Sequence, residues 1–296
     1  MSKATKRRLN AILLYLVLVL ISVIMIFPIY WTFTTAFKEP KDVITNPPKY
    51  VPFLDYQPSL YAWQELGFVP GSGEEYRTTP HSAGEILGVM KNSAIAAVGS
   101  TLLSLIIGCP AAYSLARFRF QRWKNRDIAF FVLSQRMLPP IVLVIPFFIL
   151  FRTFGLLDNI VAVILAHSVG SIPFVVWIMR EFFLDIPKEL EDSARIDGCS
   201  YLGAFTRVVL PLSTPGMAAA SVFTFIFSWN EFLFALTLTF NKARTIPVLL
   251  AGLTHGGAPL WWDLSAMLLI AIVPVIVFTL FIQKYIISGL TLGALK

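Results

Sequence analysis

Residues that could carry covalent chemistry are few in this sequence, and they are scattered. Three histidines (His81, His167 and His255) and two cysteines (Cys109 and Cys199) stand far apart and show neither a metal-ligand nor a disulfide spacing. No Gly-x-x-x-x-Gly-Lys-Ser/Thr loop is present to hold phosphates, and no His-Glu-x-x-His or Gly-x-Ser-x-Gly motif occurs. We therefore expect no catalytic residue, no metal and no cofactor in this chain, and histidines that are structural or solvent-exposed.

A second group of polar residues lies inside apolar runs: Gln135, Arg136, Asn230 and Glu231, with the aromatic Trp229 beside the last two. A charge at the centre of a bilayer costs about 2.5–3.5 kcal/mol, so such side chains should face a helix bundle or a wet cavity. Two interpretations stay open for them, which are contact with a transported solute and structural pairing between helices. Arg136 and Glu231 could neutralise one another, and Trp229 offers either a stacking face or simple packing.

The elements that position these residues are apolar helices. Hydrophobic residues make up 56% of the 296 residues and charged residues 14%, whereas soluble chains carry about 25% charged residues. A helix needs about 20 apolar residues to cross a membrane. Six runs meet this length, at 11–33, 92–115, 127–150, 160–180, 215–238 and 264–286. Prolines 139, 140, 146 and 173 interrupt the third and fourth runs and should bend them.

The basic residues orient the predicted spans. The net charge of +7 comes from Lys and Arg at the ends of apolar runs, which favours a membrane surface over nucleic acid. Fifteen of these residues fall on the side of the N-terminus and eight on the other side, so both termini are predicted to be cytoplasmic. The run Leu9–Tyr30 is too long for a signal peptide and has no cleavage site, so we expect it to be retained as the first helix.

The spans and loops suggest three regions. Residues 1–91 form a first helix and an outer loop, 92–286 a core with a cytoplasmic loop at 181–214, and 287–296 a cytoplasmic tail. The outer loop, 38–90, is either a short cap or an irregular connector. Within 181–214, Pro187 and the acids that follow it predict a short helix that ends at Gly198. One face of this helix, formed by Leu190, Ser193, Ala194 and Asp197, would fit a groove on a partner protein. Alternatively, the helix is a connector that lies on the lipid headgroups, but its acidic residues disfavour contact with an anionic membrane surface.

This loop resembles a known signature. Asp192-Ser193-Ala194, Gly198 and Val208-Val-Leu-Pro211 have the spacing of the EAA motif of ATP-binding-cassette importer permeases. Aspartate replaces the usual glutamate, and Ser193 replaces the first alanine. Nearly the whole chain resembles the carbohydrate-uptake, maltose permease-like branch of the binding-protein-dependent transport inner-membrane components. The residues that carry this resemblance are Pro139, Pro146, Gly155-Leu-Leu-Asp158, Trp229-Asn-Glu-Phe232 and Ser288–Lys296.

The resemblance implies an all-α membrane protein of the type I importer permease fold, with six transmembrane helices and a cytoplasmic coupling helix. The residues that it places at the ATPase are Glu191, Asp192, Ser193, Ala194, Asp197, Gly198, Leu210 and Pro211, with Gly289, Gly293 and Lys296 in the tail. The implied partners are a second permease that forms a heterodimer, two ATPase subunits that bind ATP and Mg, and an extracytoplasmic solute-binding protein. The implied setting is the bacterial inner membrane.

Alternatives to a sugar importer remain at this stage. A proton-coupled secondary transporter would use Glu231, and a permease of the same superfamily would carry a peptide or an ion. A membrane-embedded enzyme lacks a nucleophile or metal constellation. The solute itself is open among monosaccharides, disaccharides, polyols, glycerol phosphate and sulfonated sugars, and Arg136 leaves room for an anion.

Overall fold

The computed structural model describes residues 3–70, 82–253 and 260–293, with the side chains of 3–6, 8–9 and 285–293 left aside. The described residues form helices, turns and one isolated bridge, so the predicted all-α class is confirmed. Among the described residues, four helices are long and apolar enough to cross a membrane: α1 (Lys3–Thr35), α4 (Ala83–Arg117), α7 (Ile160–Asp185) and α14 (Trp261–Gly293). The count rises to six if each of two bent helix pairs is one span.

The predicted third span, 127–150, is broken. It consists of α5 (Asn125–Ser134) with the 3-10 turn η2 (Gln135–Met137), followed by α6 (Pro140–Thr153), and the two parts meet at 87°. Leu138 is extended at the break, with φ −67° and ψ 125°. A residue that precedes proline avoids the helical region, and Pro140 then begins the next helix at a position where its missing N–H is tolerated. The two prolines therefore turn the chain rather than only bending it.

The predicted fifth span, 215–238, is wrong as one continuous helix. The apolar pair that the structure forms is α9–α10 (Tyr201–Leu212) with α11 (Thr214–Trp229), bent by 75°. Within the first part, α9 (Tyr201–Ala204), the π-helical turn η3 (Phe205–Val209) and α10 (Leu210–Leu212) follow one another. The chain leaves the helix at Asn230 and restarts as α12 (Leu233–Leu238), because the Glu231 carboxylate accepts the N–H groups of Phe234 and Ala235.

The remaining helices are short: α2 (Pro40–Val43), α3 (Tyr61–Glu65), α8 (Lys188–Ile196) and α13 (Ile246–Gly252). The chain forms two compact units, residues 1–85 with 250–272, and residues 86–249 with 273–296. The three regions predicted from the sequence follow membrane crossings rather than packing, and they stay a prediction.

In the first unit, residues 38–70 of the predicted outer loop fold against the end of α1. The Lys38 ammonium is buried 4.2 Å from the centre of the Trp31 ring and donates a hydrogen bond to the Lys49 carbonyl at 2.6 Å. The Tyr30 hydroxyl donates to the Tyr50 carbonyl at 2.8 Å. These contacts give residues 36–56 a defined structure.

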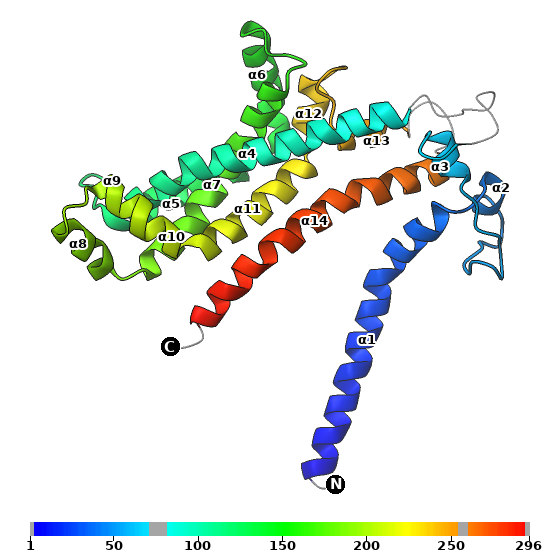
Figure 1. The fold of residues 1–296 in the computed structure, drawn as a ribbon, viewed down its shortest axis with the longest axis horizontal. Coiled ribbons are helices and arrows are strands. Elements are labelled where there is room, and N and C mark those ends of the chain that lie inside the picture. Colours follow the sequence, from blue (N-terminus) through cyan, green and yellow to red (C-terminus); the bar gives the residue numbers. More distant parts are fainter. Residues whose placement is uncertain (1–2, 71–81, 254–259, 294–296) are drawn as a thin grey trace. The chain divides into compact units, whose positions relative to one another are not determined.

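In the second unit, α4, α7 and α11 pack side by side, with α8–α10 gathered near one end of the unit and α6 and α12 away from that end (Figure 1). Small residues permit the close approach: a Cβ on Gly108 of α4 would lie 2.7 Å from Val175 of α7. In membranes, helices associate through such small-residue contacts because lipid is as apolar as the helix faces. The resulting core includes Met179, Phe183 and Phe205, all buried.

Candidate functional site

The helix predicted within the loop 181–214 is present as α8, and Gly198 ends it. Gly198 has φ +90°, its N–H bonds to the Arg195 carbonyl at 3.1 Å, and the Cys199 N–H bonds to the Ala194 carbonyl at 3.0 Å. This left-handed cap is the reason for glycine at the position, since a side chain there would be strained. A Cβ at Gly198 would meet nothing within 4 Å, so the constraint comes from the backbone and not from crowding.

Neighbouring acids of α8 have different environments. Glu191 is buried: its carboxylate forms an ion pair with the Arg117 Nε and accepts a hydrogen bond from the Tyr113 hydroxyl at 2.7 Å. Arg117 also donates to the Ile186 carbonyl at 2.9 Å. We call this set (Tyr113, Arg117, Glu191) the brace, and it joins α8 to the end of α4.

Asp192, by contrast, has a side chain that is 66% exposed, and its nearest basic group is the Arg195 guanidinium at 3.8 Å. Ser193, Asp197 and Gly198 are also exposed, while Ala194 is half-buried. Together with Arg195 and Ile196 they form the exposed face of α8 and of the turn that ends it. Of the predicted coupling residues, Glu191 therefore points inward and Asp192 outward.

The second half of the motif anchors the loop. Leu210 is half-buried against the core that contains Phe205 and Val209, and Pro211 is exposed. Ser200 caps α9 by accepting the Gly203 N–H at 3.1 Å. In the predicted tail, Gly289 and Gly293 continue α14 as helix, and Lys296 lies outside the described residues.

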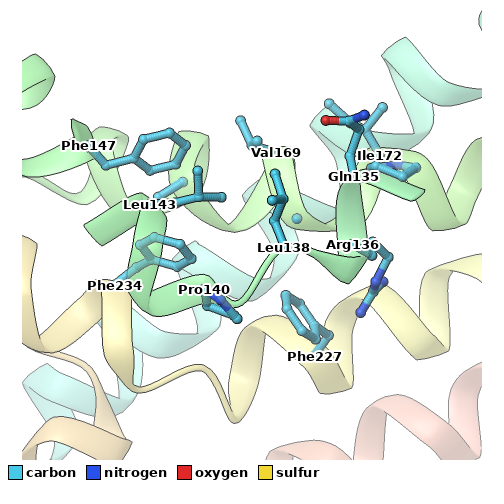
Figure 2. Close-up of a pocket in the computed structure, with 13 residues that line it drawn as sticks. Gln135, Arg136, Leu138, Pro140, Leu143, Phe147, Val169, Ile172, Phe227 and Phe234 are labelled. Carbon is cyan, nitrogen blue, oxygen red and sulfur yellow. The ribbon is translucent and has the colours of Figure 1, made fainter. Parts of the chain in front are cut away.

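The break between α5 and α6 borders a cavity of about 450 Å³. Figure 2 shows the side chains around it, which come from both sides of the break and from α7, α11 and α12. The lining includes Gln135, Arg136, Phe147, Phe227 and Phe234. Two residues of the predicted solute pathway, Gln135 and Arg136, thus line this cavity.

The other pathway residues lie elsewhere. Trp229 is buried and stacks on Phe225 at 5.8 Å between ring centres, and the exposed Asn230 donates to the Ile226 carbonyl at 2.8 Å. The pairing of Arg136 with Glu231 that the sequence left open does not form. The Glu231 Oε2 lies 2.9 Å from the His167 Nε2, off the direction of a straight hydrogen bond.

Among the histidines, His167 is fully buried between Glu231 and Ser228, whose hydroxyl lies 2.7 Å from its Nδ1. This is the structural role expected for it. His81 and His255 lie outside the described residues.

Sequence reasoning missed several functional candidates. Arg117 and Tyr113 of the brace stand at the end of a predicted span, where Arg117 served only as one of the basic residues that orient the spans.

Asp158, at φ +54°, accepts backbone N–H groups of residues 240–243 at 3.0–3.1 Å and so ties the α6–α7 turn to the segment after α12. Partial burial raises the pKa of Asp158, but the four backbone donors outweigh it and lower this pKa to about 2. In the sequence, Asp158 stands out only as part of the Gly155-Leu-Leu-Asp158 segment that resembles the permease family.

Several long apolar helices and two sharply bent apolar helix pairs are typical of a multi-pass membrane protein. Residues 104–291 match the family model described as "Binding-protein-dependent transport system inner membrane component". The chain belongs to this family, so it is an inner-membrane permease, and the resemblance noted in its sequence is confirmed.

Relatives with curated names cover almost the full chain. The trehalose/maltose transport permease MalG of Thermococcus litoralis is 33% identical over 97% of this chain and 98% of its own length. The diacetylchitobiose uptake permease DasC of Streptomyces coelicolor is 33% identical over 92% of both chains. Among solved structures, a bacterial ABC transporter involved in the import of the acidic polysaccharide alginate matches with a TM-score of 0.72 at 22% identity, over 96% of this chain and 98% of that chain. This last similarity supports the permease fold.

Proposed function

We propose that this chain is the permease subunit of an ATP-binding-cassette importer for a sugar or sugar-like solute, such as a saccharide, a polyol or a derivative. An extracytoplasmic binding protein delivers the solute, and ATPase subunits that bind ATP and Mg supply the energy. A second permease completes the pathway as a heterodimer. The family membership supports the transport role, and the names of the relatives support the class of solute.

The observation that carries the coupling role is the exposed acidic face of α8. Helix α8 stands between two spans, is held at one side by the brace, and presents Asp192, Ser193 and Asp197 to its surroundings. Exposed carboxylates on a rigid helix can pair with basic groups on a docking partner. We infer that this face docks on the ATPase, and that Gly289, Gly293 and Lys296 reach toward the same partner.

The brace gives a route by which movement of α8 reaches the membrane helices. Glu191 is fixed to Arg117 and Tyr113 on α4, and Phe205 and Val209 fix the following segment to the core. A displacement of α8 by the ATPase would therefore move α4 and α11 together, which is the rigid-body element that a two-state transporter requires. The broken spans supply the hinge positions.

Orientation follows from the charge distribution. The loop with α8 lies on the side of the membrane that carries fifteen of the Lys and Arg residues, as the positive-inside rule expects for the cytoplasm. In the proposed topology both termini and the ATPases share that side, and the binding protein docks on the side of residues 36–70.

The test is uptake by the assembled transporter in proteoliposomes, with ATP on the α8 side and the binding protein on the other. The labelled solutes form a panel of neutral and acidic sugars and polyols, and we expect at least one of them to accumulate only when ATP and the binding protein are both present. Uptake by this chain alone, driven by a proton gradient without ATP, would instead establish the secondary transporter. In that case Glu231→Gln should abolish it.

A further inference from the structure

A second, smaller cavity also borders Arg136. It has a volume of about 240 Å³ and is lined by Arg136, Ser171 and Thr224 and by the rings of Phe174, Phe223 and Phe227. All of these residues belong to one compact unit. Arg136 and Phe227 border both cavities, so the small one adjoins the larger.

Arg136 brings a full positive charge to this place without a matching acid. Its guanidinium carbon lies 5.2 Å and 4.9 Å from the ring centres of Phe174 and Phe227, and among the described residues it forms no ion pair. Figure 2 shows the side chain directed away from Gln135 and toward Phe227. The two rings hold the guanidinium by cation–π contact but leave its N–H donors free. A cation within a membrane span is stabilised when an anion or a polar cavity faces it.

Ser171 adds an independent observation. Its side chain is buried, with 1% of the residue exposed, and its hydroxyl has no hydrogen-bond partner in the described part of the chain. Buried hydroxyl groups almost always have a partner. On the facing helix, the Thr224 hydroxyl is satisfied by the Ala220 carbonyl at 2.8 Å. Ser171, one of the residues that line the cavity, therefore differs from Thr224 in having a hydroxyl without a hydrogen-bond partner among the described residues.

We infer that this small cavity binds an anionic group, a carboxylate, sulfonate or phosphate, carried by the transported solute. Arg136 supplies charge and planar N–H donors, and Ser171 supplies a hydroxyl donor, which together suit the oxygens of such a group. The aromatic walls leave room for the adjoining apolar face of a sugar ring, and the larger cavity beside it accommodates the rest of the solute. The solute class thus narrows from sugar-like to acidic sugar-like, which rests on the proposed transport function.

The same chemistry would suit a lipid phosphate, so the test has to separate the two sources. The assembled transporter is placed in nanodiscs of zwitterionic phosphatidylcholine and treated with the arginine reagent phenylglyoxal, and modification of individual arginines is followed by mass spectrometry. The probes are methyl glucuronide and methyl glucoside, which differ in one carboxylate. Arg152, an exposed arginine on α6, is the internal control.

We expect methyl glucuronide to slow modification of Arg136 severalfold, with no effect of methyl glucoside and no effect of either probe on Arg152. If neither sugar protects Arg136, the inference is overturned. If phosphatidylglycerol in the nanodisc protects Arg136 without any sugar, the anion is a lipid headgroup and the solute assignment is overturned. The assay needs no ATP, so a failure of protection can be distinguished from a failure of ATP-driven uptake.

The variant Ser171→Ala tests the second donor. Removing a hydroxyl that has no partner should leave folding intact, because no hydrogen bond is lost. We expect the variant to assemble normally and the protection of Arg136 by methyl glucuronide to weaken severalfold. Full protection in this variant would remove Ser171 from the site, and the inference would then fail in the form stated.

Discussion

The brace and the exposed face of α8 make different predictions for two adjacent acids. Glu191 and Asp192 are neighbours in the motif, and both are carboxylates. The side chains of Arg117 and Glu191 are 6% and 8% exposed, whereas that of Asp192 is 66% exposed. We therefore expect Glu191→Gln to weaken the attachment of α8 to α4, and Asp192→Asn to weaken docking of the ATPase without affecting that attachment.

The magnitudes follow from burial. Removing one partner of a buried ion pair costs about 3–5 kcal/mol, because the other charge is left uncompensated. Glutamine keeps the size of Glu191 and can still accept one hydrogen bond, so we take the lower end, about 3 kcal/mol. At about 1.4 kcal/mol per tenfold change, α8 should detach about 100-fold more often. The exposed Asp192–Arg195 pair is worth about 0–1 kcal/mol, so its loss should not change detachment measurably.

The assay is amide hydrogen exchange of residues 188–196 in the assembled transporter, together with the number of solute molecules moved per ATP. Glu191→Gln should speed exchange in this segment and lower transport per ATP. Asp192→Asn should leave exchange unchanged and reduce ATPase binding. Glu189→Gln, at an exposed acid of the same helix, is the matched control for the loss of one negative charge.

A double change gives a further check. Replacing Glu191 by Leu and Arg117 by Met removes both charges together, and apolar residues of similar volume often replace a buried pair without loss. Exchange in α8 should then return toward the wild-type rate. The reasoning is refuted if Glu191→Gln leaves exchange unchanged, or if Asp192→Asn accelerates it equally.

Two predictions concern other positions. Gly198→Val should leave the complex assembled in the membrane but abolish transport, because φ +90° costs a residue with a side chain about 1–2 kcal/mol or more and the end of α8 would shift. Wild-type uptake with normal assembly would count against the coupling role. Gly203→Ala on nearby α9 is the control. For Asp158, whose pKa falls from 3.8 to about 2 on folding, the carboxylate stabilises the fold above pH 4 and this contribution is lost as the pH falls from about 4 to 2. Thermal unfolding of wild type and Asp158→Asn should differ at pH 6 and converge near pH 2, and a constant difference across this range would disprove the role of the charge.

The sequence by itself determined the membrane class, most of the spans and the end of α8. Apolar runs of sufficient length and the proline pair at 139–140 act locally, so hydropathy and backbone restriction are enough to predict them. Gly198 likewise reveals a left-handed cap from one residue type. The prediction of the fifth span as one helix was wrong because hydropathy does not reveal the break at Asn230, after which the Glu231 carboxylate caps the next helix.

Only the tertiary structure decided which polar groups meet. Periodicity places Glu191 and Asp192 on α8 but does not say that Arg117, on a helix far earlier in the chain, lies beside one of them and not the other. It likewise could not pair Glu231 with His167 in place of Arg136, or show that Ser171 has no hydrogen-bond partner among the described residues. Such contacts depend on how whole helices pack against each other, and that arrangement is set by many small apolar contacts at once rather than by any local pattern.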